Sequence, residues 1–524
     1  MQIFYQENEN LFLTEEMVSM SDGVRLYTRC AVPKGAEKHP IVFIRTPYEA
    51  AHNGAAHDIE SYRNDPYIAH GYAVVLQHCR GRGDSEGEVC IPYSNFERTD
   101  GLETLDYIRT LPFYNGEIYL TGESYLATAH FSYLSAKPQD IKGACLGIQA
   151  DRLFSHKYRG GLLYRLNNIG WWSYMVGRKY PNAKLGEAMK RPYIDAAKRV
   201  LGEDVPAFTD TLRHNTCDEY WTDSETYNVI EAMDFPTLLV EGWFDIYTEG
   251  MCDMWHRMPA HIKQKSALMV GPFQHYTSVS DNFEYPLPNG NIGENFEVEW
   301  FDSIRENRPF KYGKRGSLNY YSIGADEWRT AEDIVPPKET LRLWLGDHIL
   351  SEAPTKATDI TYRYDPDAPT NACKPIGIWR AHEPGSVDSI ISFVSDTIQK
   401  EESFLGRVRF HLNVSSDCED TAFYARIYFI EGDSAYNLTE AMGGLVHLAG
   451  DYTPGTTTAI DLISWPIAFT LKPGMHVRVD ITSESGFYLP HPNVKGHFAY
   501  VRDAKIAHNT IHTEGSYVEL PMEE

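Results

Sequence analysis

Ser124, Asp245 and His275 are residues whose types and order along the chain could support nucleophilic catalysis. Ser124 lies in "YLTGESYLATAH", where an apolar run passes through Gly-Glu-Ser into a segment rich in Ala and Leu. Asp245 follows the apolar run of "LLVEGWFDIY", and His275 follows that of "LMVGPFQHYT". A serine nucleophile needs a base and an acid that orients the base, and one arrangement carries them in the order Ser, acid, His.

Each of these residues also has a purely structural interpretation. Ser124 could cap a helix, with Glu123 suiting the positive end of the helix dipole. Asp245 could form a turn, and His275 could be a partly buried histidine bonded to backbone. Gly-x-Ser alone occurs often by chance, and Leu126 stands where the usual motif has a second Gly. The presence of all three residues in the required order favours the catalytic interpretation.

The segments around Ser124 predict the elements that would position it. "PIVFIRTPY", "YAVVLQHCR" and "EIYLTGES" are typical of buried parallel strands, and "ERTDGLETLDYIRTLPF" has apolar residues near helical spacing. This alternation predicts a doubly wound α/β domain, whose first part spans residues 1–149. In such a domain the serine occupies a sharp strand-to-helix turn, so that its hydroxyl projects over the sheet edge.

The rest of the chain predicts three further segments. Residues 150–235 lack β-rich runs, and "GLLYRLNNIGWWSYMVGRKY" and "LGEAMKRPYIDAAKRVLG" favour an inserted helical cap. "FPTLLVEGWFD" and "KSALMVGPFQH" return to the parallel sheet, giving a second part of the α/β domain over 236–333. Segments such as "GRVRFHLNVSS" and "HVRVDITSE" alternate apolar and polar residues, which predicts an antiparallel β-sandwich or jelly roll over 334–524.

Composition narrows the class of partner. A net charge of −25 would repel phosphate backbones and anionic lipid, so we expect no nucleic acid, no membrane and a small-molecule substrate. The eight cysteines include no Cys-x-x-Cys, and His491 and His497 have no matching ligand set, so no metal is expected. The start of the chain does not resemble a secretory signal, which favours a cytoplasmic location.

Five separated motifs resemble those of the cocaine esterase and X-Pro dipeptidyl-peptidase family of serine hydrolases. They are "RTPY" from Arg45, "GRGDSEGE" from Gly81, "NGEIYLTGESYLA" from Asn115, "GWFD" from Gly242 and "GPFQH" from Gly271. The resemblance runs through nearly the whole chain. It implies an α/β-hydrolase domain, a helical cap and a C-terminal jelly roll.

The resemblance also implies roles for individual residues. Ser124 would be the nucleophile, His275 the base and Asp245 the acid that orients His275. The oxyanion hole would combine the N–H of Tyr125 with the hydroxyl of Tyr48.

Two further residues match positions near the acyl pocket of the family, Trp172 and Tyr247. Trp172 could equally pack in the core, and Tyr48 could merely pack beside Pro47. The chain departs from the family pattern at Ala127, where Gly is common three residues after the serine. One extra methyl group there could reposition the turn slightly.

These features predict hydrolysis of a carboxylic ester through an acyl-enzyme, with no metal or organic cofactor. Two alternatives stay open: an amide or peptide hydrolase of the X-Pro dipeptidyl-peptidase type, and a glycan-binding module with a vestigial hydrolase site. Nothing in the sequence identifies the acyl group or the alcohol, and a homo-oligomer is neither indicated nor excluded.

The residues that follow Asp245 indicate whether the acyl group of the substrate can carry a positive charge. The related α-amino-acid ester hydrolases place two carboxylates two and three residues after this aspartate, whereas this chain has Tyr247 and Thr248. We therefore expect poor activity on substrates with a free α-ammonium group, unless Asp151 or Glu249 supplies the missing negative charge.

Overall fold

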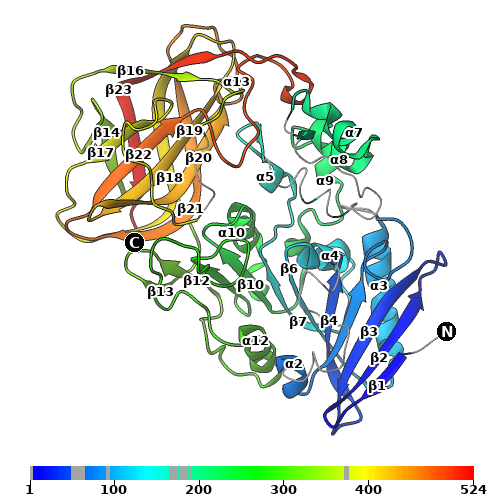
Figure 1. The fold of residues 1–524 in the computed structure, drawn as a ribbon. Helices are drawn as coiled ribbons and strands as arrows, with labels where there is room; N and C mark the ends of the chain where they lie inside the picture. The colour runs from blue at the N-terminus through cyan, green and yellow to red at the C-terminus, as the bar shows by residue number, and fades with distance from the viewer. Residues whose placement is uncertain are drawn as a thin grey trace.

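A computed structural model describes residues 4–48, 65–89, 95–164, 171, 175, 187–188, 190–370 and 377–524. It contains two large sheets, one formed mainly by the first half of the chain and one by the C-terminal part (Figure 1). Short helices and turns of residues 150–235 lie near the carboxyl ends of the strands of the first sheet. Within the described residues, no helix combines the length and the apolar character needed to cross a membrane.

The first sheet is parallel in its centre and antiparallel at its edges. Its strand order is β1-β2-β3-β5-β4-β6-β7-β10-β11-β12-β13, and the pairs from β5 to β12 are parallel. The predicted strands "PIVFIRTPY", "YAVVLQHCR" and "EIYLTGES" are β4, β5 and β6. The strands are β1 Phe4–Glu7, β2 Leu11–Ser19, β3 Arg25–Pro33, β4 His39–Thr46, β5 Ala73–His78, β6 Tyr114–Glu123, β7 Ile141–Gly147, β10 Thr237–Gly242, β11 Ala267–Gly271, β12 Ser317–Ser322 and β13 Glu327–Ala331.

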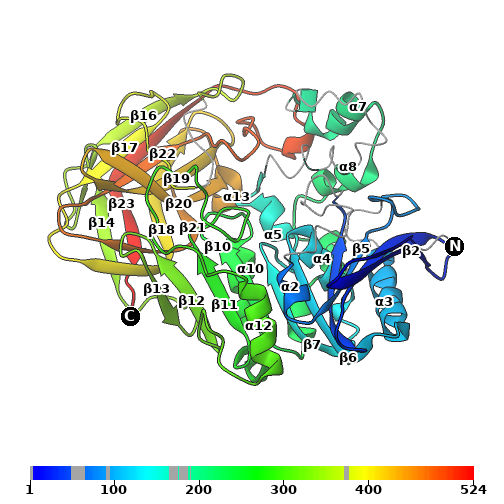
Figure 2. The same ribbon diagram turned by 60° about the horizontal axis from the view of Figure 1, so that its bottom comes forward.

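Helices cover both faces of this sheet, which is why its central strands β4, β5, β10 and β11 are buried along almost their whole length. On one face α3, α4 and α10 share a core with Phe43, Leu120 and Leu239; on the other face α2 and α12 pack over Val42, Tyr119 and Val240. In Figure 2, α2 and α12 lie in front of the sheet. The helices are α2 Pro66–Ala69, α3 Asn95–Thr110, α4 Tyr125–Leu134, α10 Thr248–Arg257, α11 Ala260–Lys263 and α12 Phe296–Arg305.

The segment predicted as a helical cap begins differently from the prediction. "GLLYRLNNIGWWSYMVGRKY" was expected to start a helix, but Leu162–Leu163 form strand β9, which pairs with β8, Tyr158–Arg159. Gly160 and Gly161 have φ values of 54° and 78°, so they form a tight turn that the apolar spacing does not reveal. Most of the remaining segment lies outside the described residues. The other elements are α5 Phe154–Lys157, η3 Tyr193–Asp195, α7 Ala196–Leu201, α8 Pro206–Arg213, α9 Glu219–Thr222 and η4 Val229–Ala232.

The C-terminal sheet combines strands that are buried on both faces, such as β19 and β22, with strands that have one buried and one partly exposed face, such as β18. Along β18 buried and partly buried residues alternate from Phe404 to Ser416, as expected for a strand with a single core-facing side. The pairing is antiparallel except between β15 and β17, which are parallel. The elements are β14 Thr340–Leu345, β15 Ile349–Ser351, β16 Asp359–Tyr364, β17 Ile391–Ser395, β18 Glu402–Ser416, β19 Ala422–Glu431, β20 Ser434–Gly444, α13 Leu445–Ala449, β21 Thr458–Leu471, β22 His476–Thr482, η5 Phe498–Tyr500 and β23 Ala507–Pro521.

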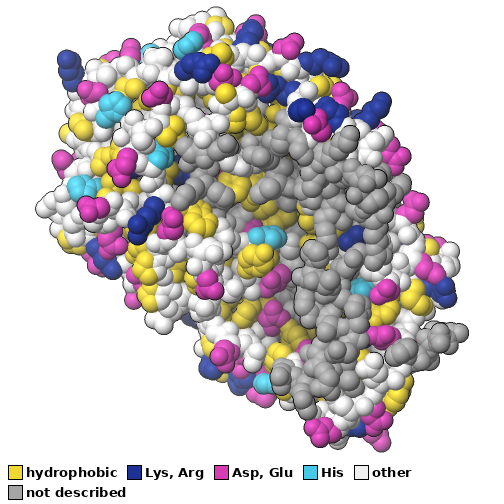
Figure 3. Space-filling model, in the orientation of Figure 1, with side chains coloured by type: hydrophobic (Ala, Val, Ile, Leu, Met, Phe, Trp, Pro, Cys, Tyr) yellow, Lys and Arg dark blue, Asp and Glu magenta, His cyan; other side chains and the backbone are white. Residues whose placement is uncertain are grey.

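The chain has a net charge of −25. On the face drawn in Figure 3, Asp and Glu side chains are scattered among Lys and Arg and do not form one continuous patch. Ligands of open α/β sheets bind at the carboxyl ends of the central strands, and we expect the substrate site at that edge of the first sheet.

Candidate active site

Ser124 occupies the turn between β6 and α4. Its backbone has φ 57° and ψ −127°, a conformation that costs an L-residue free energy and that is found mainly at functional sites. The Ser124 N–H donates to the Gly147 carbonyl at 3.0 Å, which ties the turn to β7. A Cβ at Gly122 would lie 2.8 Å from the Leu126 carbonyl carbon, so this close turn requires Gly.

The Ser124 hydroxyl does not cap helix α4. Within the described part of the chain its side chain forms no capping hydrogen bond, and Oγ lies 2.9 Å from Nε2 of His275. The capping interpretation is therefore wrong. The helix begins at Tyr125, so the amino-terminal N–H groups of α4 lie next to Ser124.

The structure brings Ser124, His275 and Asp245 into one continuous contact. His275 Nδ1 lies 2.6 Å from Asp245 Oδ2, on the opposite side of the ring from Ser124. Asp245 is buried, and its Oδ1 accepts from the Tyr247 N–H at 2.9 Å. This geometry fixes the imidazole with one nitrogen toward the carboxylate and the other toward the hydroxyl.

The ends of β10 and β11 hold the Asp245 and His275 loops together. The Phe244 N–H donates to the Phe273 carbonyl at 2.9 Å, and a Cβ at Gly242 would lie 2.4 Å from that same oxygen. The Thr248 hydroxyl donates to the Gly242 carbonyl at 2.6 Å and closes the turn after the strand. The "GWFD" motif thus contains a glycine required by close backbone approach.

The charges around His275 stabilise its protonated form relative to a histidine in water. Burial acts to lower the pKa of His275, but the charge of Asp245 and its hydrogen bond to the ring outweigh burial and raise the pKa. The charge of Glu123 acts in the same direction. The imidazole can therefore accept a proton from Ser124 with more driving force than an isolated histidine.

Tyr48 lies in the same apolar cluster as Tyr125. Its N–H donates to Thr46 Oγ1 at 3.1 Å, and its hydroxyl lies 3.5 Å from Trp171 Nε1. The ring of Trp171 lies 5.7 Å from that of Tyr125. Both residues proposed for the oxyanion hole are therefore on the cap-facing side of the sheet edge.

Arg82, which the sequence analysis missed, supports the Tyr48 segment. It is almost completely buried, and its Nε donates to the Pro47 carbonyl at 2.7 Å while Nη1 donates to the Met175 carbonyl at 2.6 Å. The "GRGDSEGE" motif is a turn in which Gly81 and Gly83 have positive φ. The glycines in that motif gave a signal for a turn, but nothing in it indicated a buried arginine.

Of the two residues expected in the acyl pocket, the structure describes Tyr247 but not Trp172. The Tyr247 ring lies 5.7 Å from the His275 ring, next to the proposed base. Trp172 lies outside the described residues. His156, which no motif singled out, packs on the other side of Tyr247 with a ring separation of 4.5 Å.

Two carboxyl groups that are largely shielded from water lie close to Ser124 and Asp245: Glu123 precedes Ser124 in the chain, and Glu241 lies near Asp245. Glu123 accepts from Thr277 Oγ1 at 2.6 Å, and burial together with the charge of Glu297 raises the pKa of Glu123 to about 7. Glu241 accepts from the Gly242 N–H at 2.8 Å, and burial and the neighbouring Asp245 raise its pKa well above the usual value. Among the described residues, no cluster of His, Cys, Asp and Glu is arranged to hold a metal ion.

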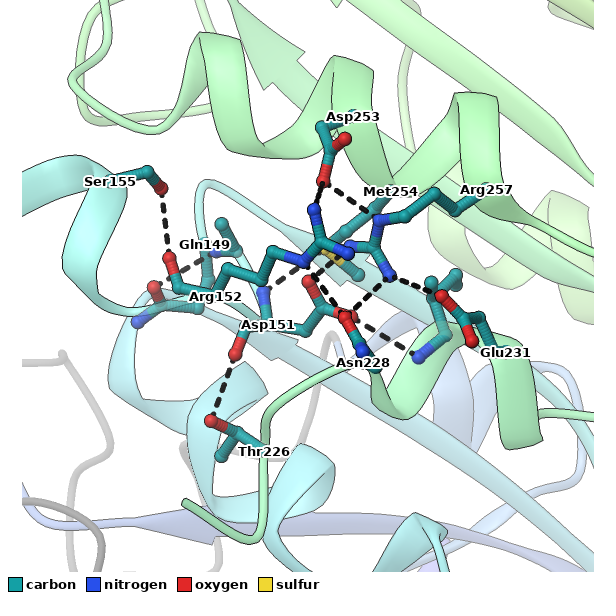
Figure 4. A network of polar contacts seen from close by, with 12 residues as sticks. Gln149, Asp151, Arg152, Ser155, Thr226, Asn228, Glu231, Asp253, Met254 and Arg257 are labelled. Carbon is teal, nitrogen blue, oxygen red and sulfur yellow. Dashed lines mark hydrogen bonds and ion pairs between the residues drawn. The ribbon is translucent and has the colours of Figure 1, made fainter. Parts of the chain in front are cut away.

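Asp151 and Glu249 are both engaged in ion pairs. Asp151 Oδ1 lies 2.6 Å from Arg257, inside a network that includes Arg152 (Figure 4). Glu249 pairs with Arg159 at 2.5 Å and with Arg407 at 3.1 Å. Both carboxylates are therefore already paired with arginines, and neither offers an unpaired negative charge to a substrate ammonium group.

Two family models match this chain. The model of the X-Pro dipeptidyl-peptidase (S15 family) matches residues 22–277, and that of the X-Pro dipeptidyl-peptidase C-terminal non-catalytic domain matches residues 311–519. The chain belongs to this family of hydrolases. The predicted resemblance is confirmed.

Individual relatives extend the similarity over most of the chain. The cocaine esterase of Rhodococcus sp. (strain MB1 Bresler) is 23% identical over 464 residues, covering 78% of this chain and 79% of that protein. An aminopeptidase from the marine sediment archaeon Thaumarchaeota archaeon has a TM-score of 0.83 at 18% identity, covering 99% of this chain and 98% of its own. An α-amino acid ester hydrolase has a TM-score of 0.83 at 19% identity, covering 100% and 98%. These solved structures confirm the α/β-hydrolase fold with a C-terminal β-domain.

Proposed function

We propose that this hydrolase cleaves carboxylic esters whose acyl part carries no free ammonium group, through an acyl-enzyme on Ser124. The observation that carries the proposal is the contact from Ser124 Oγ through His275 to the buried Asp245, at 2.9 and 2.6 Å. The strained backbone at Ser124 supports it, because such strain persists where a function requires it.

Each residue of the site has a defined step in this mechanism. His275 Nε2 takes the proton of Ser124 as its oxygen attacks the ester carbonyl, and Asp245 stabilises the imidazolium. The oxyanion accepts hydrogen bonds from the Tyr125 N–H and the Tyr48 hydroxyl. Collapse of the tetrahedral intermediate releases the alcohol, which takes its proton from His275. Water then attacks the acyl-enzyme with His275 again as base.

In the described part of the chain, the two carboxylates considered as partners for an ammonium group, Asp151 and Glu249, are already paired, which favours uncharged acyl groups. The two residues after Ile246 are Tyr247 and Thr248, and the Thr248 hydroxyl lies within hydrogen-bond distance of two backbone carbonyls, those of Gly242 and Asp245. Asp151 and Glu249 are neutralised by arginines. A substrate ammonium would lose hydration without gaining a counter-charge, which is costly.

A matched substrate pair tests this proposal. N-acetyl-alanine ethyl ester and alanine ethyl ester differ at the α-nitrogen, so their relative kcat/KM isolates the effect of the ammonium. We expect the acetylated ester to be at least tenfold better, and Ser124→Ala to abolish hydrolysis of both. Alanyl-proline p-nitroanilide tests the peptidase alternative. Faster cleavage of this anilide, or of the free amino ester, would contradict the proposal.

A further inference from the structure

A cavity of about 200 Å³ lies where the β8–β9 hairpin meets the C-terminal sheet. Two backbone hydrogen bonds fix its walls: the Gly444 N–H donates to the Gly160 carbonyl at 2.8 Å, and the Leu489 N–H donates to the Leu163 carbonyl at 2.9 Å. The segment around η5, drawn in red, crosses from the C-terminal sheet toward α7 and α8 and brings Phe498 into the lining (Figure 1). Among the described residues that line the cavity, none belongs to the candidate active site.

The cavity can be reached from solvent. Thr216, His447 and Gly496 belong to its lining and are exposed, whereas Leu163 and Leu489 are buried and form an apolar inner wall. An engineered apolar cavity of about 150 Å³ is large enough to bind benzene. A ligand with one six-membered ring therefore fits this space.

Asp420 places a carboxylate in the wall of the cavity. The residue is 8% exposed, and its side chain keeps 12% of its surface accessible. Oδ1 accepts from the N–H groups of Thr421 and Val446, both at 2.9 Å, and these bonds fix the orientation of the carboxylate. The basic side chain that the described residues place within 4.0 Å of Asp420 is His491, whose Nε2 lies 3.4 Å from Oδ2.

His491 does not supply a counter-charge to this carboxylate. The Asn493 N–H donates to His491 Nδ1 at 3.1 Å, so Nδ1 carries a lone pair and the ring is the neutral form with its proton on Nε2. Lys495 is close enough to interact with the charge of Asp420, but its ammonium is paired with Asp451 at 2.6 Å. No Lys or Arg is among the described residues of the lining. A carboxylate shielded from water without a counter-charge costs free energy, which a bound cation would offset.

We propose that this cavity binds a small organic ammonium ion. The ammonium donates to Asp420 Oδ2, and the hydrocarbon part of the ligand lies against Leu163, Leu489 and Phe498. The charge of Asp420 excludes carboxylate and phosphate ligands. Because the walls come from residues 150–235 and from the C-terminal β-domain, the ligand bridges these two parts of the chain. The site is separate from the one proposed for ester hydrolysis.

Three ligands that share one ring test the requirement for charge. Cyclohexylammonium, cyclohexanol and cyclohexanecarboxylate are titrated into the whole protein at neutral pH, and binding is measured by calorimetry. A salt concentration of about 0.15 M screens the exposed carboxylates of this acidic chain. We expect cyclohexylammonium to bind at least about tenfold more tightly than cyclohexanol, because it gains a charge-assisted hydrogen bond, and cyclohexanecarboxylate not to bind. Equal affinity for the amine and the alcohol, or no saturable binding of the amine at millimolar concentrations, would overturn the proposal.

Two variants locate the binding in this cavity. Asp420→Asn keeps an oxygen for the two N–H groups and removes the charge, so the amine should bind at least about tenfold more weakly. Gly444 has φ −71° and ψ 139°, which any residue can adopt, and a Cβ there would lie 4.0 Å from His491 Nε2. Gly444→Val therefore fills part of the cavity and should abolish binding of both the amine and the alcohol; it decides the matter if Asp420→Asn does not fold.

Asp417→Asn is the matched control. Asp417 is an exposed carboxylate in the same loop that also accepts a backbone N–H, from His508 at 2.8 Å, and it is not among the described residues that line the cavity. This variant should bind the amine as the wild type does. Wild-type affinity in Asp420→Asn or Gly444→Val, or an equal loss in Asp417→Asn, would overturn the inference. A cooperative thermal transition verifies that each variant is folded, and none of these measurements depends on ester hydrolysis.

Discussion

Glu123, the residue before the proposed nucleophile, should make the free energy of unfolding depend on pH in a way that one substitution removes. Its carboxyl accepts from the Thr277 hydroxyl at 2.6 Å and lies near Glu297. Burial and the Glu297 charge raise its pKa from 4.5 to about 7. The side chain is therefore a neutral acid in the folded protein at pH 6, and a carboxylate in the unfolded chain.

The size of the effect follows from this shift. Because the folded state holds the proton up to about pH 7 and the unfolded state loses it near 4.5, folding takes up a proton between these values. This proton uptake stabilises the folded state relative to its stability at high pH. The stabilisation is fully present below pH 4.5 and is lost as the pH rises through 7. A rise of the pKa from 4.5 to about 7 corresponds to at most about 3.4 kcal/mol.

Glu123→Gln cannot ionise and keeps an oxygen that accepts from Thr277. The free energy of unfolding of the variant, relative to wild type, should therefore increase by up to about 3 kcal/mol between pH 4.5 and pH 8. Urea unfolding of both proteins at several pH values measures this difference, and the other titrating groups largely cancel because both proteins contain them. Thr277→Val retains the carboxyl and should retain the pH dependence. A wild-type-minus-variant difference that does not change with pH would refute the reasoning.

Three further predictions concern turnover. Tyr48→Phe should lower kcat about 10²–10³-fold with little change in KM or melting temperature, because the hydroxyl bonds an oxygen charged only in the transition state; a kcat within about threefold of wild type would leave Tyr48 as a packing residue. The acid limb of kcat/KM against pH should have its midpoint above 6.5, since Asp245 raises the pKa of His275 and only the neutral imidazole accepts the serine proton; a midpoint below 6.5 would contradict this. Asp245→Asn should reduce kcat by roughly 10³–10⁴ by misorienting the ring, and should move that midpoint to lower pH; an unchanged pH profile would argue against the contact.

The arrangement of Ser124, Asp245 and His275 could be anticipated because it depends on local signals. Each residue follows an apolar run that is long enough to be a buried strand, and parallel strands bring their carboxyl ends to one edge of a sheet. β6, β10 and β11 are these strands. Order along the chain and topology were sufficient to predict their proximity.

Features set by contacts between distant segments could not be predicted in this way. Glu123 bonds Thr277, 154 residues away, and the two are close only because β6 and the loop after β11 end at the same edge. Arg82 reaches Pro47 and Met175 through a turn whose sequence indicates only its glycines. The cavity lined by Asp420 forms only where the β8–β9 hairpin packs against the C-terminal sheet.

Two errors of element prediction also have physical causes. The apolar residues after Gly161 suit a helix, but the paired glycines reverse the chain and produce the β8–β9 hairpin. The N-terminal strands β1 and β2 were not among the predicted strands; they extend the sheet by antiparallel pairing at its edge.

Covalent labelling with a fluorophosphonate tests the central claim most directly, because the reagent requires an activated serine and makes no assumption about the substrate. Incubation of the whole protein, followed by peptide mass analysis, should find one adduct, on Ser124. The adduct should be absent in Ser124→Ala and should form far more slowly in His275→Ala. Labelling that persists in Ser124→Ala, or a wild-type protein that hydrolyses esters without being labelled at Ser124, would contradict the account.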